Sequence, residues 1–208
     1  MVRNPLKFVR EKKNLRLQPR VFISCEGKVT ERLYFSLLRE LFPEITFLIT
    51  KKGDNKSAPY YVVKRMKDLQ KEGRFTAVSK EGAKDYAFLV MDIDGRQDSS
   101  FEEVKEWLKA NAEHHFVVIS NPKFELWLLL HYEEAKGVIT PLDCDEHLKR
   151  FIKNYQKTLP NDFPMGNTGI AVERALKKCP CWKVAWETPG TTSFGCFIKK
   201  LEAISKDG

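Results

Sequence analysis

Apolar residues recur along this chain with two different spacings, and their alternation predicts an α/β fold. Short apolar runs typical of buried strands occupy residues 20–25, 45–50, 86–91 and 116–120. Apolar positions at helical spacing follow each run, over residues 30–41, 58–71, 99–113 and 124–132. Because strands and helices alternate, we expect a mostly parallel four-stranded sheet covered by helices on both faces.

The pattern changes after Pro141, where no further strand is expected. Three helical segments follow, separated by loops that contain Pro and Gly, at residues 143–155, 167–178 and 191–203. We therefore divide the chain into three parts. These are an arm over 1–19, an α/β core over 20–135 and a C-terminal helical elaboration over 136–208, packed on the core.

Acidic residues follow two of the predicted strands. Glu26-Gly27 comes directly after the first strand, and Asp92-Ile93-Asp94 directly after the third. In an open parallel sheet, ligands bind outside the carboxyl ends of the strands. Residues two apart on an extended strand point the same way, so both aspartates could reach one cation. Each motif alone is also common in solvated turns. Together the three acids favour a Mg²⁺ site, because close carboxylates repel without a cation.

A further acid lies in an otherwise apolar segment just past the fourth strand. Glu125 is flanked by Phe124 and Leu126-Trp127-Leu128. An unpaired buried charge is costly, so this carboxylate must be paired, exposed or functional. It could be a further metal ligand, a base or the partner of a lysine. For His131, six residues later, a structural role is expected.

The formal net charge is +8, and it is unevenly distributed. Residues 1–20 hold seven Lys and Arg residues and a single Glu. Such an arm either attracts polyphosphate or is a solvated tail. Lys153 and Lys157 are four apart on a predicted helix with Tyr155 between them, so they either hold a phosphate or form a solvated face.

No apolar stretch approaches the length of a membrane-spanning helix, and the N-terminus lacks the apolar segment of a secretory signal. We therefore expect a cytoplasmic protein without membrane partners, in which the five cysteines are free thiols. No P-loop, GxSxG or HExxH motif is present in the sequence.

Four segments of the chain resemble RloB-like proteins, in the same order from about residue 20 to the C-terminus. They are Ile23–Phe35, Asp92–Asp94, Ser120–His131 and the segment with Tyr155 and Lys157. RloB-like proteins belong to the Toprim superfamily, so the resemblance implies a Toprim-like α/β core in which Glu26, Asp92 and Asp94 bind Mg²⁺. It also implies that Glu26 can act as a general acid or base. The family is associated with restriction-linked and phage-defence loci, with abortive infection and with an ATPase partner.

These observations together lead to one functional hypothesis and one alternative. The hypothesis is a Mg²⁺-dependent Toprim nuclease, with Mn²⁺ as a substitute, that cleaves phosphodiester bonds of RNA or DNA in antiphage defence. The catalytic residues would be Glu26, Asp92, Asp94 and Glu125, and the phosphate-binding residues Lys28, Lys123, Lys153, Tyr155 and Lys157. The alternative is a non-catalytic nucleic-acid-binding or regulatory subunit that works with an ATPase. A homodimer is compatible with either.

Overall fold

The structure is a computed structural model that describes residues 18–27, 29–50, 58–77, 84–95, 101–153, 155–180 and 182–207. Its elements are β1 (Arg20–Cys25), α1 (Thr30–Leu41), β2 (Thr46–Ile49), α2 (Pro59–Lys71), β3 (Asp85–Asp92), α3 (Glu102–Ala110), β4 (His115–Asn121), α4 (Glu125–Leu129), α5 (Pro141–Lys149), η2 (Met165–Asn167), α6 (Thr168–Lys178), α7 (Trp182–Glu187), β5 (Thr191–Thr192) and α8 (Phe194–Asp207).

The described strands form one sheet in the order β2-β1-β3-β4-β5. The first four strands are parallel, and β5 pairs antiparallel to β4 through Asn121 and Thr191. This confirms the predicted α/β fold with a mostly parallel sheet. The fifth strand was not predicted, because two residues are too few for a periodic signal.

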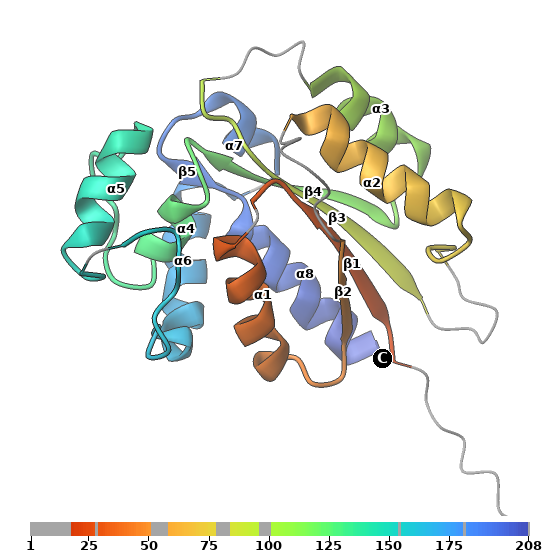
Figure 1. The fold of residues 1–208 in the computed structure, drawn as a ribbon, viewed down its shortest axis with the longest axis horizontal. Coiled ribbons are helices and arrows are strands. Elements are labelled where there is room, and N and C mark those ends of the chain that lie inside the picture. Colours follow the sequence, from red (N-terminus) through yellow and green to blue (C-terminus); the bar gives the residue numbers. More distant parts are fainter. Residues whose placement is uncertain are drawn as a thin grey trace, which may run out of the picture.

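Helices cover both faces of the sheet, with α2 and α3 on one face and α1 and α8 on the other (Figure 1). Each strand contributes side chains to the hydrophobic cores on both faces of the sheet, because successive side chains point to opposite faces. In β1, Val21 and Ile23 belong to the hydrophobic core on the α1 side, and Phe22 belongs to the core on the α2 side. Burial on both faces explains why the strand sequences are continuous apolar runs.

The C-terminal part of the chain returns to the sheet. Besides β5, it supplies α8, whose Phe197 ring lies 4.9 Å from the Phe88 ring of β3 between centroids. Both residues belong to one core cluster. The predicted division after residue 135 stays a prediction, and residues on both sides of it share this core.

Several predicted helix boundaries were wrong. The helix expected over 143–155 is α5, which starts with Pro141 and ends at Lys149. Its start is set by a capping box between Thr140 and Asp143, which the sequence reading missed. The helix expected over 124–132 is the short α4, and the one expected over 191–203 divides into β5 and α8. The unpredicted α7 precedes them.

Three further sequence expectations concern the cysteines, membrane-spanning helices and the N-terminal arm. Four of the cysteines, Cys25, Cys144, Cys179 and Cys196, are free in the structure. Within the described ranges, no helix combines the length and apolar character needed to cross a membrane. Residues 1–17 of the basic arm, and residues 99 and 100 at the start of the helix expected over 99–113, lie outside the described residues.

Candidate functional site at the carboxyl edge of the sheet

The strand order has one switch point, between β1 and β3. From β1 the chain passes through α1 to β2 on one side, and α2 then leads to β3 on the other. In such sheets the crevice outside the carboxyl ends at the switch point is the usual ligand site. Glu26 directly follows β1, and its N–H donates to the Val90 carbonyl of β3 at 3.1 Å. Asp92 is the last residue of β3. The two predicted acidic motifs therefore flank this crevice.

The second aspartate of the motif is not part of the strand. Asp94 lies in a turn with φ of 41°, so the expectation that Asp92 and Asp94 share one strand face was wrong. Hydrogen bonds hold this turn against the end of β4. The Ile93 N–H donates to the Ser120 carbonyl, and the Asp94 N–H donates to the Pro122 carbonyl, each at 2.9 Å.

Glu125 is the first residue of α4, and it is buried with 7 % of its surface exposed. The Tyr155 hydroxyl donates a 3.0 Å hydrogen bond to Glu125 Oε1. The Thr30 hydroxyl at the start of α1 donates to the Lys157 carbonyl at 2.6 Å. Burial and the charge of Glu125 raise the pKa of Tyr155, so its phenol is a neutral donor at physiological pH. The structure thus brings together three of the predicted positions, Glu125, Tyr155 and Lys157.

Glu31, in the first turn of α1, is a buried acid that was not among the site residues predicted from the sequence. Burial raises its pKa, and the charges of Glu125 and Glu26 add to this effect. Backbone N–H groups of Glu31 itself and of Gly27 oppose the rise by donating to the carboxylate. Glu26, Glu31 and Glu125 are therefore close enough to interact electrostatically. The sequence did contain a signal for Glu31, because it is an acid in the first turn of a predicted helix, five residues after Glu26.

The contact between Glu31 and Gly27 explains the glycine in the Glu-Gly motif. A Cβ atom at residue 27 would overlap the Glu31 carboxylate. Alanine at this position would displace the Glu31 carboxylate, so glycine is favoured here by the close approach of a side chain rather than by an unusual backbone angle.

Lys123 was predicted to bind phosphate, and the structure gives it a protein partner. Its Nζ lies 2.6 Å from Oδ1 of Asp145 on α5. Burial acts to lower the pKa of Lys123, but the hydrogen bond to Asp145 and the charge of Glu125 together raise it. The Lys123 ammonium is therefore charged, and it lies close enough to Glu125 to interact with it electrostatically.

The other predicted cations lie on irregular chain. Lys153 and Lys157 were expected on one helix face, which was wrong because α5 ends at Lys149. Lys157 has φ of 60°, which no helix contains, and both lysines are exposed. The contacts of Tyr155 and Lys157 with Glu125 and Thr30 hold this segment in a non-helical path. Lys28 lies outside the described residues.

Arg65 of α2 is a cation at this edge that the sequence reading did not single out. Its guanidinium donates to the Cys25 carbonyl, at the end of β1, at 2.9 Å. Burial lowers its pKa, while the charge of Glu26 opposes this effect. Because a guanidinium stays protonated in proteins, Arg65 places a positive charge beside Glu26.

The oxygen ligands at this edge are of the kind that Mg²⁺ prefers. Among the described residues, however, no group of three or more His, Cys, Asp or Glu side chains could hold a metal ion. Mg²⁺ usually keeps several waters and takes only one or two carboxylates together with substrate phosphates. The predicted triad of Glu26, Asp92 and Asp94 stays a prediction.

His131 lies in the aromatic core, as its expected structural role requires. It is buried, and its ring contacts those of Tyr34, Trp127 and Phe163. Nδ1 lies 3.1 Å from the Trp127 carbonyl, which assigns the proton to that nitrogen. Burial lowers the pKa of His131 to about 4, so the ring is neutral at physiological pH.

Comparison with known proteins gives one match. A family model described as RloB-like protein matches residues 21–201, which include all the described site residues. No curated protein and no solved structure matches the chain.

Proposed function

Because the chain belongs to the RloB-like protein family, we propose that it is a Mg²⁺-dependent nuclease of the Toprim type. The observation that supports this most is the position of Glu26 and Asp92. They flank the switch point of the sheet, where open α/β proteins bind their ligands. Carboxylates in that crevice suit a phosphodiester substrate only with a divalent cation between them.

The proposed chemistry assigns separate tasks to the residues at this edge. Glu26, Asp92 and Asp94 would hold a Mg²⁺ ion, or Mn²⁺ in its place, which would polarise a phosphoryl oxygen and lower the pKa of an attacking water. Glu31, whose pKa is raised by burial, holds a proton more readily than an ordinary glutamate and is the proposed proton donor at this edge.

Two further residues support this arrangement. The Tyr155 hydroxyl fixes the orientation of the Glu125 carboxylate. Arg65 partly neutralises Glu26 and so lowers the cost of bringing a phosphate to the acids. Lys123, Lys153 and Lys157, with Lys28, are the proposed phosphate contacts.

The proposed substrate is RNA or DNA, and the setting is antiphage or restriction-linked defence. The net charge of +8, with seven cations in residues 1–20, favours a polyanionic partner. Family membership supports the defence setting and an ATPase partner.

A cleavage screen tests the proposed function. Wild type is incubated with tRNA, single-stranded and duplex substrates in Mg²⁺, in Mn²⁺ and in EDTA. We expect metal-dependent cleavage that Asp92→Ala and Glu26→Ala abolish without loss of the folded structure. Glu113→Gln is the matched control, because Glu113 is an exposed acid that precedes β4 at the opposite edge. An unchanged rate in Asp92→Ala would contradict the assignment.

One observation favours the second candidate, a non-catalytic nucleic-acid-binding or regulatory subunit of an ATPase. The described residues contain no preformed group of three metal ligands. Salt-dependent binding without cleavage in any metal, by the chain alone and with its ATPase, would support this candidate over the nuclease.

A further inference from the structure

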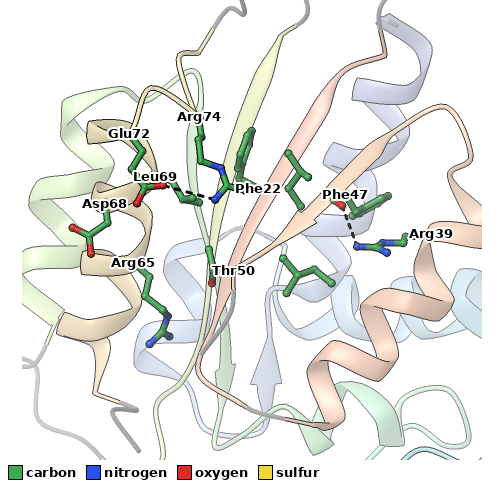
Figure 2. Close-up of a pocket in the computed structure, with 11 residues that line it drawn as sticks. Phe22, Arg39, Phe47, Thr50, Arg65, Asp68, Leu69, Glu72 and Arg74 are labelled. Carbon is green, nitrogen blue, oxygen red and sulfur yellow. Dashed lines mark hydrogen bonds and ion pairs between the residues drawn. The ribbon is translucent and has the colours of Figure 1, made fainter. Parts of the chain in front are cut away.

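A cavity of about 520 Å³ lies beside the edge strand β2, and among its lining residues only Arg65 has been given a functional role above. Its apolar lining comes from β1, β2 and α2 and includes Phe22, Phe47 and Leu69. Figure 2 shows it between α2, which carries Arg65 and Asp68, and the strands. The volume is within the range of small-ligand sites, and the rest of the lining is mostly polar or charged.

Thr50 provides a polar group without a partner in this cavity. It follows the last residue of β2, and its backbone N–H donates a 2.8 Å hydrogen bond to the Ile23 carbonyl. Its hydroxyl is buried, lines the cavity and has no hydrogen-bond partner within the described part of the chain. A buried hydroxyl usually has one, because leaving it unpaired is costly. Thr50 is therefore available to bind a ligand.

Cations from two helices and the segment after α2 line the same cavity. They are Arg39 on α1, Arg65 on α2 and Arg74 just beyond α2. In Figure 2, Arg65 and Thr50 lie toward one end of the cavity, and Arg74 lies toward the other. An arginine beside a free hydroxyl is suited to a phosphate, since both donate hydrogen bonds to its oxygens.

Two acids complete the polar lining. Asp68 lies on α2, and Glu72, the C-cap residue four positions later, lies on the same side of the helix and forms an ion pair with Arg74 at 3.7 Å. They follow Arg65 along that helix. Carboxylates accept hydrogen bonds from hydroxyl and amino groups, which a nucleoside carries and an inorganic anion lacks. The lining therefore matches a phosphate at one end and a nucleoside at the other.

Arg65 connects this cavity to the candidate site. It lines the cavity, and its guanidinium also donates to the carbonyl of Cys25, the residue directly before Glu26. A strand whose phosphate contacts Arg65 would continue toward the carboxyl edge. Single-stranded nucleic acid is commonly bound in this way, by cations along a groove with apolar surface beneath the bases.

We propose that this cavity holds one nucleotide of the nucleic-acid strand that the carboxyl edge is proposed to cleave. The phosphate contacts Arg65 and the Thr50 hydroxyl, and the nucleoside faces Asp68 and Glu72. The inference rests on the proposed function, because it takes the substrate to be nucleic acid. Beyond the proposed function, it specifies the binding site of a nucleotide next to the cleaved bond.

The test is binding of short fluorescein-labelled single-stranded RNA and DNA, measured by fluorescence anisotropy in EDTA to prevent cleavage. Thr50→Val removes only the unpaired hydroxyl. We expect it to weaken binding by about tenfold, the value of one hydrogen bond to a charged group. Its melting temperature should stay equal or rise, because the hydroxyl has no hydrogen-bond partner among the residues that the structure describes. Arg65→Gln should weaken binding at least as much.

Lys64→Gln is the matched control, because Lys64 is exposed on α2 and does not line the cavity. Affinities of Thr50→Val and Arg65→Gln within twofold of Lys64→Gln would overturn the inference, and the nuclease proposal would stand if Asp92→Ala still abolished cleavage. A wild type that binds no oligonucleotide would overturn both.

A competition arm with AMP and with inorganic phosphate separates the sources of the phosphate. If AMP binds wild type and not Thr50→Val, while oligonucleotide binding is equal in both, the cavity holds a free nucleotide and the strand proposal is wrong. Displacement of the oligonucleotide by AMP in wild type, together with weaker oligonucleotide binding in Thr50→Val, supports it.

Discussion

The Tyr155 hydroxyl donates a 3.0 Å hydrogen bond to the Glu125 carboxylate, across thirty positions of the chain. The same hydroxyl lies 3.4 Å from the Thr30 hydroxyl at the start of α1. One phenol thus connects the segment after α5 with α4 and with the first turn of α1. It also provides a donor for a carboxylate that is buried beside two other acids.

Tyr155→Phe should destabilise the protein, because it removes a donor from the buried Glu125 carboxylate and leaves the ring in place. We expect a loss of about 1–3 kcal/mol in the free energy of unfolding, the usual cost of an unsatisfied buried polar group. Urea unfolding followed by circular dichroism measures it. Tyr60→Phe, at a tyrosine that is 45 % exposed, is the control and should change stability little. Equal effects of the two substitutions would contradict the role of the hydrogen bond.

Gly27→Ala should displace the Glu31 carboxylate, because the new methyl group overlaps it. The buried carboxylate would lose its backbone donors, so we expect a cost of about 1–3 kcal/mol in the free energy of unfolding. Gly169→Ala in α6 is the control, because nothing lies within 4 Å of a Cβ atom there. Glu31→Ala should remove most of the penalty of Gly27→Ala, and a thermodynamic cycle of the two variants tests this coupling. Additive effects would show that the overlap is not the cause.

His131 should make the protein sensitive to acid. Its pKa is lowered from 6.5 to about 4 in the folded state, so the unfolded state binds a proton more readily between these values. Stability is therefore complete above pH 6.5 and falls as the pH decreases toward 4, by about 3 kcal/mol in total. His131→Leu should abolish this contribution, which appears as a shallower decline of the unfolding free energy over the same pH range. Identical slopes for variant and wild type would refute the assignment.

Asp145→Asn should leave the Lys123 ammonium without its ionic partner. Asp145 is 37 % exposed, so solvent screening limits the expected loss to about 1 kcal/mol of unfolding free energy. Lys123→Met combined with Asp145→Asn should recover part of it, since neither charge is then left unpaired. Lys199→Met on α8, at an exposed lysine paired with Glu202, is the control and should have almost no effect. Thermal unfolding of these three variants and of wild type provides the comparison.

Much of the fold could be predicted because the signals were local. The strand β1 was predicted with its observed bounds, and α1 likewise, since each has an uninterrupted periodic pattern. Helix α5 was predicted too long because the sequence after Lys149 keeps a helical pattern, whereas contacts of Tyr155 and Lys157 with α4 and α1 hold that segment in another conformation. Such contacts lie more than twenty residues away in the sequence and carry no local signal.

The sequence by itself determined that Glu26 and Asp92 stand at the ends of two buried strands, because burial of both strand faces requires continuous apolar runs. Only the tertiary structure decided which residues join them. The order β2-β1-β3 makes the two strands adjacent, and the packing of α1, α2 and α4 brings Glu31, Arg65 and Glu125 to the same edge. The physical reason is that helix packing and strand order depend on shape and burial summed over the whole chain. Periodicity reports only the face of each element that is buried.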